Sequence, residues 1–290
     1  MGDYDKEVAD RIEAVKVIYE VEQLPVFQNR MYESQEEAKN CPKGDIRLVE
    51  SLKSGLVYNE RFRPEVMQYD KNYQNEQAVS SGFRTHLETV LEIIANSIGR
   101  QSIVEVGCGK GFFLEMLLAN GFDAKGFDPT YEGTNPRVAK QYFSAEFGFQ
   151  ADGLVLRHVL EHVQGPVDFL MQLKDANNGG GKIYIEVPCF DWICEKRAWF
   201  DIFYEHANYF RLIDLCRMFG SVYESGYLFG DQYVYVVADL SSVKYPEFDE
   251  STRAAIPSDF MSSLTDSYVW NREMRLSSGA VRLKALYFRY

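Results

Sequence analysis

The sequence predicts an α/β protein that is built on a doubly wound, mainly parallel sheet, with a small domain before it. Strand-like apolar runs alternate with helix-like stretches between residues 87 and 240, a glycine-rich turn follows the first of these strands, and an acid ends the second. At 290 residues, 46% hydrophobic and 26% charged, the chain has the composition of an ordinary globular protein with a full core.

The first β-α-β unit lies in "IVEVGCGKGFFLEMLLANGFDAKGFD". Ile103–Val106 is short and apolar, as expected of a buried strand. Phe112–Ala119 has helical spacing, and Gly121 fits the end of that helix. "DAKGFD" predicts a second strand that ends at Asp128.

Three more strands follow along the chain. Gly153–Leu156 predicts a strand, and the recurrence of Val159, Leu160 and Val163 predicts a helix directly after it. Lys182–Val187 predicts the next strand, which Pro188 ends. "YVYVVADL" predicts the terminal strand of the same sheet.

The glycine-rich turn predicts a nucleoside-like ligand. Gly107, Gly109 and Gly111 leave bare backbone at the carboxyl end of a strand, where such sheets bind ligands. Asp128 ends the next strand and is placed to accept hydrogen bonds from two ribose hydroxyls. The spacing is G-x-G-x-G and not the G-x-G-x-x-G of dinucleotide folds, which disfavours a dehydrogenase. Glu105 would attract a cation and repel a pyrophosphate.

Composition excludes several classes of partner. A net charge of −12 argues against nucleic acid. No run approaches the roughly 20 apolar residues of a membrane span, and no signal peptide is evident, so we expect a cytoplasmic protein without a membrane partner. Five cysteines without a C-x-x-C pair indicate reduced thiols and no metal site.

The acid, the three glycines and the downstream Asp128 resemble the first motif of class I S-adenosylmethionine-dependent methyltransferases, which share a Rossmann-like fold. The resemblance implies that S-adenosylmethionine is the cofactor and that no zinc is bound. It implies a cofactor-binding role for nine residues: Tyr73, Glu105, Gly107, Gly109, Gly111, Phe112, Asp128, Pro129 and His158.

A second resemblance is carried by "RHVLEHV", "IYIEVP", "YEHANYF" and "LIDLCRMFG", which look like segments of bacterial sugar C-methyltransferases. Those enzymes act on nucleotide-linked keto-deoxysugars, so the implied partner is a small-molecule acceptor of that kind. The resemblance implies that Tyr204, Glu205 and His206 are catalytic. His206 would remove the proton α to a ketone, and Tyr204 would donate to the developing enolate oxygen.

The resemblance covers residues 15–240 and has two departures. Ser51 and Ser54 stand where the family has its second cysteine pair, so the N-terminal zinc site is expected to be absent. The resemblance also implies that the family's C-terminal domain is absent, because only about fifty residues follow "YVYVVADL". We therefore expect a small N-terminal domain at 1–68, a connecting cap segment at 69–86, a cofactor-binding domain at 87–240 and a helical tail at 241–290.

Two alternatives to the sugar C-methyltransferase remain open. One is an O- or N-methyltransferase on a sugar or small natural product, and the other is a non-catalytic protein that binds the cofactor. Four basic side chains near the motifs fit either a diphosphate or ordinary solvation: Arg157, Lys196, Arg197 and Arg211. The sequence does not indicate an oligomeric state.

Overall fold

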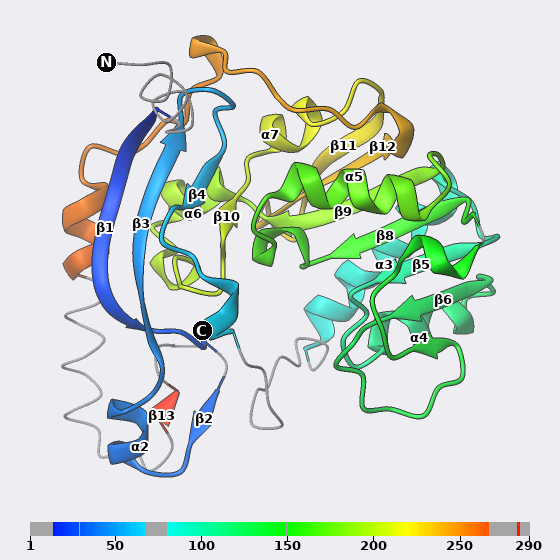
Figure 1. Cartoon of the computed structure of the whole chain (residues 1–290), viewed down its shortest axis with the longest axis horizontal. Coiled ribbons are helices and arrows are strands. Elements are labelled where there is room, and N and C mark those ends of the chain that lie inside the picture. The colour runs from blue at the N-terminus through cyan, green and yellow to red at the C-terminus, as the bar shows by residue number, and fades with distance from the viewer. Residues whose placement is uncertain (1–13, 29, 68–79, 149, 267–282, 285–290) are drawn as a thin grey trace, which may run out of the picture. The chain divides into compact units, whose positions relative to one another are not determined.

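The computed structural model describes residues 14–28, 30–67, 80–148, 150–266 and 283–284, and Figure 1 labels its helices and strands. The chain forms two compact units. Unit 1 consists of residues 1–74, 191–209 and 246–290, and unit 2 consists of residues 75–190 and 210–245. The boundaries expected from the sequence differ from these units at two places, because residues 191–209 and the segment after 245 cluster with the N-terminal residues.

Unit 2 contains a seven-stranded sheet with the order β7-β6-β5-β8-β9-β12-β11. The first five of these strands are parallel, β12 runs antiparallel to β9, and β11 runs antiparallel to β12. The chain leaves the central β5 toward β6 on one side and later adds β8 on the other, so the strand order reverses beside β5. The strands are β5 (Ile103–Val106), β6 (Ala124–Phe127), β7 (Val138–Ala139), β8 (Gly153–Arg157), β9 (Lys182–Pro188), β11 (Val222–Leu228) and β12 (Tyr233–Asp239).

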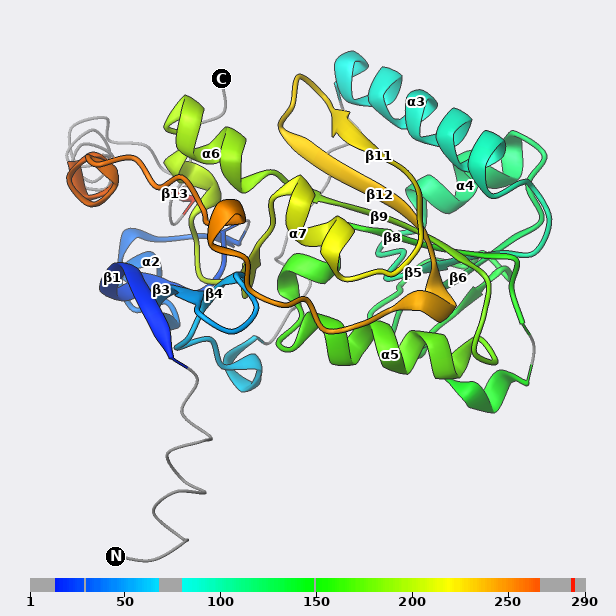
Figure 2. The same ribbon diagram turned by 90° about the horizontal axis from the view of Figure 1, so that it is seen from above.

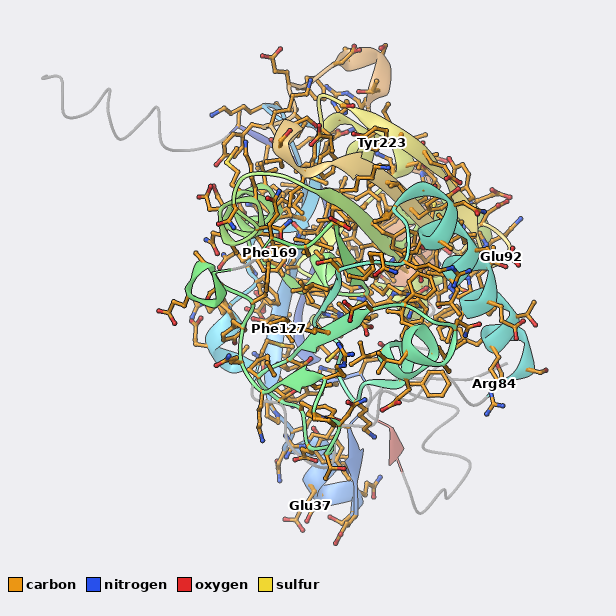
Figure 3. The ribbon with its side chains drawn as sticks, turned by 90° about the vertical axis from the view of Figure 1, so that its right-hand side faces the viewer. Glu37, Arg84, Glu92, Phe127, Phe169 and Tyr223 are labelled. Atoms are coloured by element: carbon orange, nitrogen blue, oxygen red, sulfur yellow. The ribbon has the colours of Figure 1, made fainter. Side chains whose placement is uncertain are left out.

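Helices cover both faces of this sheet, which confirms the expected α/β class. In Figure 2, α3 (Ser81–Ser97) and α4 (Phe112–Ala119) lie on one face and α5 (Pro166–Ala176) lies on the other. The helix α3 begins at Ser80, whose hydroxyl accepts the backbone N–H of Phe83. Its exposed Arg84 and Glu92 point into solvent in Figure 3. Its apolar side packs in the core through Phe83, Leu87, Val90, Leu91 and Ile94.

The predicted elements of unit 2 are confirmed with one exception. Ile103–Val106 and Phe112–Ala119 have the bounds that were expected. The helix that was expected directly after β8 is wrong, because that stretch forms only a 3₁₀ turn, η3 (Leu160–His162). Gly165, with φ of 72°, ends the turn, and Pro166 then starts α5 because proline suits the first position of a helix.

Unit 1 is built on a four-stranded sheet with the order β1-β3-β4-β10, in which all neighbouring strands are antiparallel. Its first three strands come from the N-terminal residues: β1 (Val15–Pro25), β3 (Lys43–Ser51) and β4 (Val57–Asn59). The fourth, β10 (Asn208–Tyr209), pairs with β4 from almost 150 residues further along the chain. The smaller elements are β2 (Met31–Tyr32), which pairs with β13 (Leu283–Lys284), and the helices α2 (Gln35–Lys39) and α6 (Phe190–Lys196).

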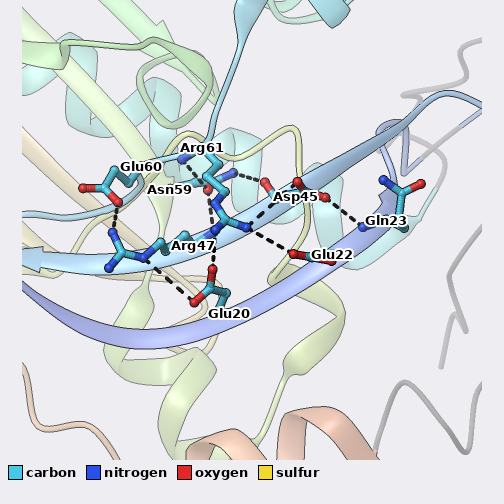
Figure 4. A network of polar contacts seen from close by, with 8 residues as sticks. All are labelled: Glu20, Glu22, Gln23, Asp45, Arg47, Asn59, Glu60 and Arg61. Carbon is cyan, nitrogen blue, oxygen red and sulfur yellow. Dashed lines mark hydrogen bonds and ion pairs between the residues drawn. The ribbon is translucent and has the colours of Figure 1, made fainter.

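A network of charged side chains lies on β1 and β3 and in the turn directly after β4 (Figure 4). Arg47 forms ion pairs with Glu60 and Glu20, and Arg61 lies 2.5 Å from a carboxylate oxygen of Glu20. The Oδ1 atom of Asn59 accepts the backbone N–H groups of both arginines. The four charged side chains, those of Glu20, Arg47, Glu60 and Arg61, are 29–42% exposed, so solvent screens their ion pairs.

The segment after residue 245 is part of unit 1. The Oε1 atom of the buried Glu50, on β3, accepts the backbone N–H of Ala254 at 2.9 Å. Residues 260–266 are helical, and the ring of Phe260 packs against Tyr19 and Trp199. In the ranges that the structure describes, no helix is long and apolar enough to cross a bilayer.

Candidate functional site

The glycine-rich turn joins β5 to α4 at the point where the strand order of unit 2 reverses. Gly107, Gly109 and Gly111 have φ of 74°, 54° and 79°, a conformation that side chains rarely adopt. A Cβ at Gly107 would lie 2.6 Å from Cγ2 of Val159, so that glycine is also required by packing. Apart from Gly109 itself and its two neighbours in the chain, no heavy atom of the described residues lies within 4 Å of a Cβ built on Gly109. The turn is therefore open at its middle glycine.

Asp128 follows β6 and connects two loops at the carboxyl edge of the sheet. Its Oδ2 atom accepts the backbone N–H of Gly109 at 2.8 Å. Its Oδ1 atom accepts the backbone N–H and the hydroxyl of Thr130 at 2.8 and 2.7 Å. A carboxylate offers about four acceptor positions, and these bonds use three of them. Asp128 thus shapes the turn itself and keeps one acceptor position for a ligand, and sequence reasoning missed Thr130.

Glu105 lies in β5 and is 4% exposed. Burial, against the opposing charge of Arg157 and with a smaller contribution from the charge of Asp128, raises the pKa of its carboxyl group to about 8. Its Oε2 atom is buried and has no hydrogen-bond partner among the described residues. An unpartnered buried carboxyl oxygen fits a cationic ligand that also carries N–H donors, such as the ammonium group of the expected S-adenosylmethionine, because a sulfonium sulfur has no hydrogen to donate. This is the observation that fits the expected sulfonium cofactor.

Of the other residues predicted to bind the cofactor, three lie at the carboxyl edge of the sheet, and one lies outside the described residues. Phe112, the first residue of α4, is 42% exposed, and Pro129 is half-buried next to Asp128. His158 directly follows β8. These residues therefore gather at the carboxyl ends of β5, β6 and β8, as expected. Tyr73 lies outside the described residues.

A buried cluster around Glu186, on β9, was not found from the sequence. Burial alone would raise the pKa of this carboxyl group, but Arg157, His158 and His86 hold it well below its usual value. We name Glu186 together with Arg157, His86, His158 and Tyr184 the Glu186 cluster. Its contacts to Oε1 come from Arg157 Nη2 at 3.0 Å, His86 Nε2 at 3.1 Å and His158 Nε2 at 3.1 Å, and Tyr184 donates its hydroxyl to Oε2 at 2.6 Å.

One signal in the sequence pointed to this cluster. Glu186 interrupts the apolar strand "IYIEVP", and a charged residue in a fully buried strand needs partners. Those partners come from α3, β8 and β9, and His86 is 100 residues away from Glu186 in the sequence. The pairing is therefore a property of the folded sheet.

The basic side chains considered for a diphosphate are already paired. Arg157 contacts Glu186, and the buried Arg211 binds Asp214 through Nε and Nη2 at 2.8 and 2.7 Å. Solvation at the surface does not explain these two arginines, because the side chains of Arg157 and Arg211 are only 9% and 4% exposed. The remaining pairs, both exposed, are Arg197 with Asp259 and Lys196 with Glu195.

The three residues predicted to be catalytic lie in unit 1, on the loop before β10, and all three are buried. Tyr204 Oη accepts the backbone N–H of Arg63 at 3.0 Å, and Glu205 Oε2 accepts that of Gln28 at 2.5 Å. His206 Nδ1 lies 3.2 Å from the carbonyl oxygen of Asp201. A carbonyl only accepts, so Nδ1 carries the hydrogen and Nε2 is the basic nitrogen.

Ser51 and Ser54, which stand where the resembled family has its second cysteine pair, lie in a tight turn at the end of β3. The hydroxyl oxygen of Ser51 accepts the backbone N–H groups of Lys53 and Ser54, at 3.1 and 2.9 Å. These bonds close the turn with groups of the protein itself.

A sequence family model described as a methyltransferase domain matches residues 69–222, which is more than half of the chain. A search of curated proteins found no match.

A comparison with solved structures matches this chain to several methyltransferases, all at TM-scores below 0.5. A magnesium protoporphyrin IX methyltransferase from Synechocystis PCC 6803 is 15% identical (57% of this chain, 87% of the other, TM-score 0.41). A 1,6-didemethyltoxoflavin N1-methyltransferase from Burkholderia thailandensis is 13% identical (65% and 96%, TM-score 0.42). An N-methyltransferase from Bradyrhizobium japonicum WM9 is 16% identical (56% and 88%, TM-score 0.39).

Proposed function

The chain belongs to the methyltransferase domain family, and we propose that it transfers a methyl group from S-adenosylmethionine to a carbon atom of a nucleotide-linked keto-sugar. The family and the fold indicate that the chain is an S-adenosylmethionine-dependent methyltransferase of class I. The acceptor and the atom that is methylated are the proposal.

The observation that supports the cofactor part of the proposal is the open glycine turn together with the unpartnered carboxyl oxygen of Glu105. Gly109 leaves room for a ligand, Asp128 has an acceptor position for a ribose hydroxyl, and Glu105 Oε2 lacks a partner. When bound, S-adenosylmethionine supplies an electrophilic methyl group on a positively charged sulfur. The three residues would hold its nucleoside and favour its charge.

Carbon methylation needs a base as well as a methyl donor, because a proton α to the ketone must leave. His206 fits this task because its Nδ1–H is held by the carbonyl of Asp201, so that Nε2 is basic. Burial raises the pKa of Tyr204, so its phenol stays protonated at neutral pH and is suited to donate to an enolate oxygen. Glu205 accepts the backbone N–H of Gln28, which connects this loop to the segment between β1 and β2.

The test is turnover of S-adenosylmethionine carrying a labelled methyl group with a panel of nucleotide-linked keto-sugars. We expect a product whose NMR spectrum places the new methyl group on carbon. A methyl group on oxygen or nitrogen would favour the O- or N-methyltransferase. Cofactor binding without transfer to any acceptor would favour a non-catalytic binding protein.

The variant His206→Asn tests the base. It retains a polar side chain of similar size but cannot take up the proton, so we expect turnover to be abolished and the affinity for S-adenosylhomocysteine to stay near that of the wild type. A fully active variant would remove His206 from the mechanism.

A further inference from the structure

His158 adopts a conformation that its residue type disfavours. It directly follows β8 and has φ of 53°, in the left-handed region, where an L side chain is strained. Such strain persists only where the surroundings hold it, and it is frequent at functional sites. The contacts of His158 show what holds it.

Both ring nitrogens of His158 lie within ion-pair distance of carboxylates, although Nε2 makes no hydrogen bond among the described residues. Nε2 lies 3.1 Å from Oε1 of Glu186, and Nδ1 lies 3.4 Å from Oε1 of Glu161. The backbone N–H of His158 also donates to the carbonyl oxygen of Glu186 at 2.9 Å. Burial opposes protonation, but the two carboxylates outweigh it and raise the pKa of His158 to about 9. At neutral pH the ring is therefore an imidazolium clamped between two acids.

The clamp is anchored in the sheet. Glu186 is completely buried, and the other members of the Glu186 cluster fix its carboxylate from β8, β9 and α3. Glu161 is 2% exposed and lies in η3, three residues after His158. His158 thus joins a rigid strand to the turn that follows β8.

That turn packs directly on the glycine turn. Val159 is the next residue, and a Cβ at Gly107 would lie 2.6 Å from its Cγ2 atom. The backbone conformation at His158 therefore decides where Val159 sits and how closely the two turns approach each other. A different φ at His158 would move Val159 relative to Gly107.

We propose that His158 is a positioning residue, which holds the turn after β8 in its strained conformation so that Val159 supports the glycine turn in the form that binds the cofactor. This inference rests on the proposed function, because it requires that the glycine turn bind S-adenosylmethionine. It assigns His158 a role through Glu186, Glu161 and Val159 in place of the direct cofactor contact that was expected.

The variants His158→Ala and His158→Gly separate positioning from contact. Alanine loses the clamp and keeps the strain, so we expect S-adenosylhomocysteine to bind about tenfold more weakly in calorimetry. Glycine adopts the left-handed conformation freely, so we expect an affinity within about threefold of the wild type.

Asn178 offers a matched control. It has the same φ of 53° in unit 2 but is exposed and follows α5. Asn178→Ala and Asn178→Gly should differ in thermal stability and leave the affinity for S-adenosylhomocysteine unchanged.

The pH profile supplies a readout that a merely structural role would not move. The groups that face His158 are Glu186 and Tyr184 on β9, Arg157 on β8, Glu161 in η3, His86 on α3 and Tyr233 on β12. Relative to His158→Gly, the wild type should lose affinity for S-adenosylhomocysteine as the pH rises through about 9, where the clamp loses its charge. Glu105 ionises in both proteins, so its contribution cancels in the ratio.

The outcomes are distinct. Rescue by glycine together with the pH difference supports the inference, and the glycine variant and the pH profile suffice where His158→Ala fails to fold. If the wild type binds S-adenosylhomocysteine and both variants bind it equally well, or are equally weakened, the inference is overturned and the proposed function stands. If the wild type does not bind S-adenosylhomocysteine, both are overturned.

Discussion

Unit 1 and unit 2 both contain a network of charged side chains, and the two networks differ in burial. The network of Arg47 and Arg61 lies on the sheet of unit 1, where its side chains are 29–42% exposed. The Glu186 cluster of unit 2 has its central carboxylate completely buried. Exposed pairs are screened by water, whereas a buried charge must be matched by partners in fixed positions. The comparison teaches that only the buried network is suited to fix the geometry of a site.

The largest effect should come from removing the central acid of the buried network. Glu186→Ala leaves the buried Arg157 without its ion-pair partner and His158 with Glu161 alone, and we expect the free energy of unfolding to fall by about 3–5 kcal/mol. The matched control is Glu60→Ala, which breaks the exposed ion pair with Arg47 and should cost at most about 1 kcal/mol. Urea unfolding measures both. Equal losses of stability in the two variants would contradict the difference between the buried and the exposed network.

Unit 1 also has buried polar side chains, and two of its tyrosines sharpen the comparison. Tyr204→Phe removes the phenol that is proposed to donate to the enolate, so we expect kcat to fall about 10²–10³-fold in the labelled-methyl assay. Tyr209 is also buried, and its hydroxyl donates to the carbonyl oxygen of Phe203 at 3.1 Å. Tyr209→Phe should lower stability by about 1 kcal/mol and leave kcat near the wild-type value. If the two variants had the same kcat, the role of Tyr204 would be excluded.

Two aspartates at the opposite ends of β6 form the next pair. Asp128→Ala removes the acceptor of the Gly109 and Thr130 hydrogen bonds, and we expect the affinity for S-adenosylhomocysteine to fall about 100-fold. Asp123 is 56% exposed and binds Arg137 at 2.9 Å. Asp123→Ala should leave the affinity unchanged in the same calorimetric titration. A loss of affinity in the control would mean that the effect is not specific to the carboxyl edge of the sheet.

The smallest expected effect is the release of a proton when the cofactor binds. The pKa of Glu105 is about 8, so its carboxyl group is mostly protonated at pH 7, and a cationic cofactor favours the charged form. Binding of S-adenosylmethionine at pH 7 should therefore release close to one proton. Calorimetry in two buffers of different ionisation enthalpy measures this release, and Glu105→Gln should abolish it. An unchanged release in that variant would assign the proton to another group.

The same raised pKa affects stability in a defined direction. In the unfolded chain the Glu105 carboxyl group ionises near 4.5, and in the fold it ionises near 8. Its favourable contribution is therefore complete below about pH 4.5 and is lost as the pH rises to 8. Glu105→Gln should be less sensitive to pH across this window in thermal unfolding.

The sequence was sufficient to predict the local elements of unit 2. Strand β5, the glycine turn and α4 follow one another without interruption, so apolar spacing and glycine positions define them. The stretch after β8 was predicted wrongly as a helix, because the apolar spacing of Val159, Leu160 and Val163 does not show that Gly165 ends a turn before Pro166 begins α5. The expected fold class and cofactor were correct because they depend on this local motif.

The Glu186 cluster and the composition of unit 1 could not be predicted in the same way. His86 and Glu186 meet only after α3 packs on the sheet, and Ala254 reaches Glu50 from 204 residues away. Local periodicity contains no information about such partners. The roles of Tyr204, Glu205 and His206 came from a resemblance and stay a prediction.

The late strand of the unit 1 sheet has a consequence for protein synthesis. The partner of β4 is β10, which the ribosome makes only after β5, β6, β8 and β9. The sheet of unit 1 therefore stays incomplete while these strands of unit 2 are synthesised. Strands β11 and β12 of unit 2 are made after β10 in turn, so the synthesis of the two sheets overlaps and the first unit is not complete before the second has begun to form.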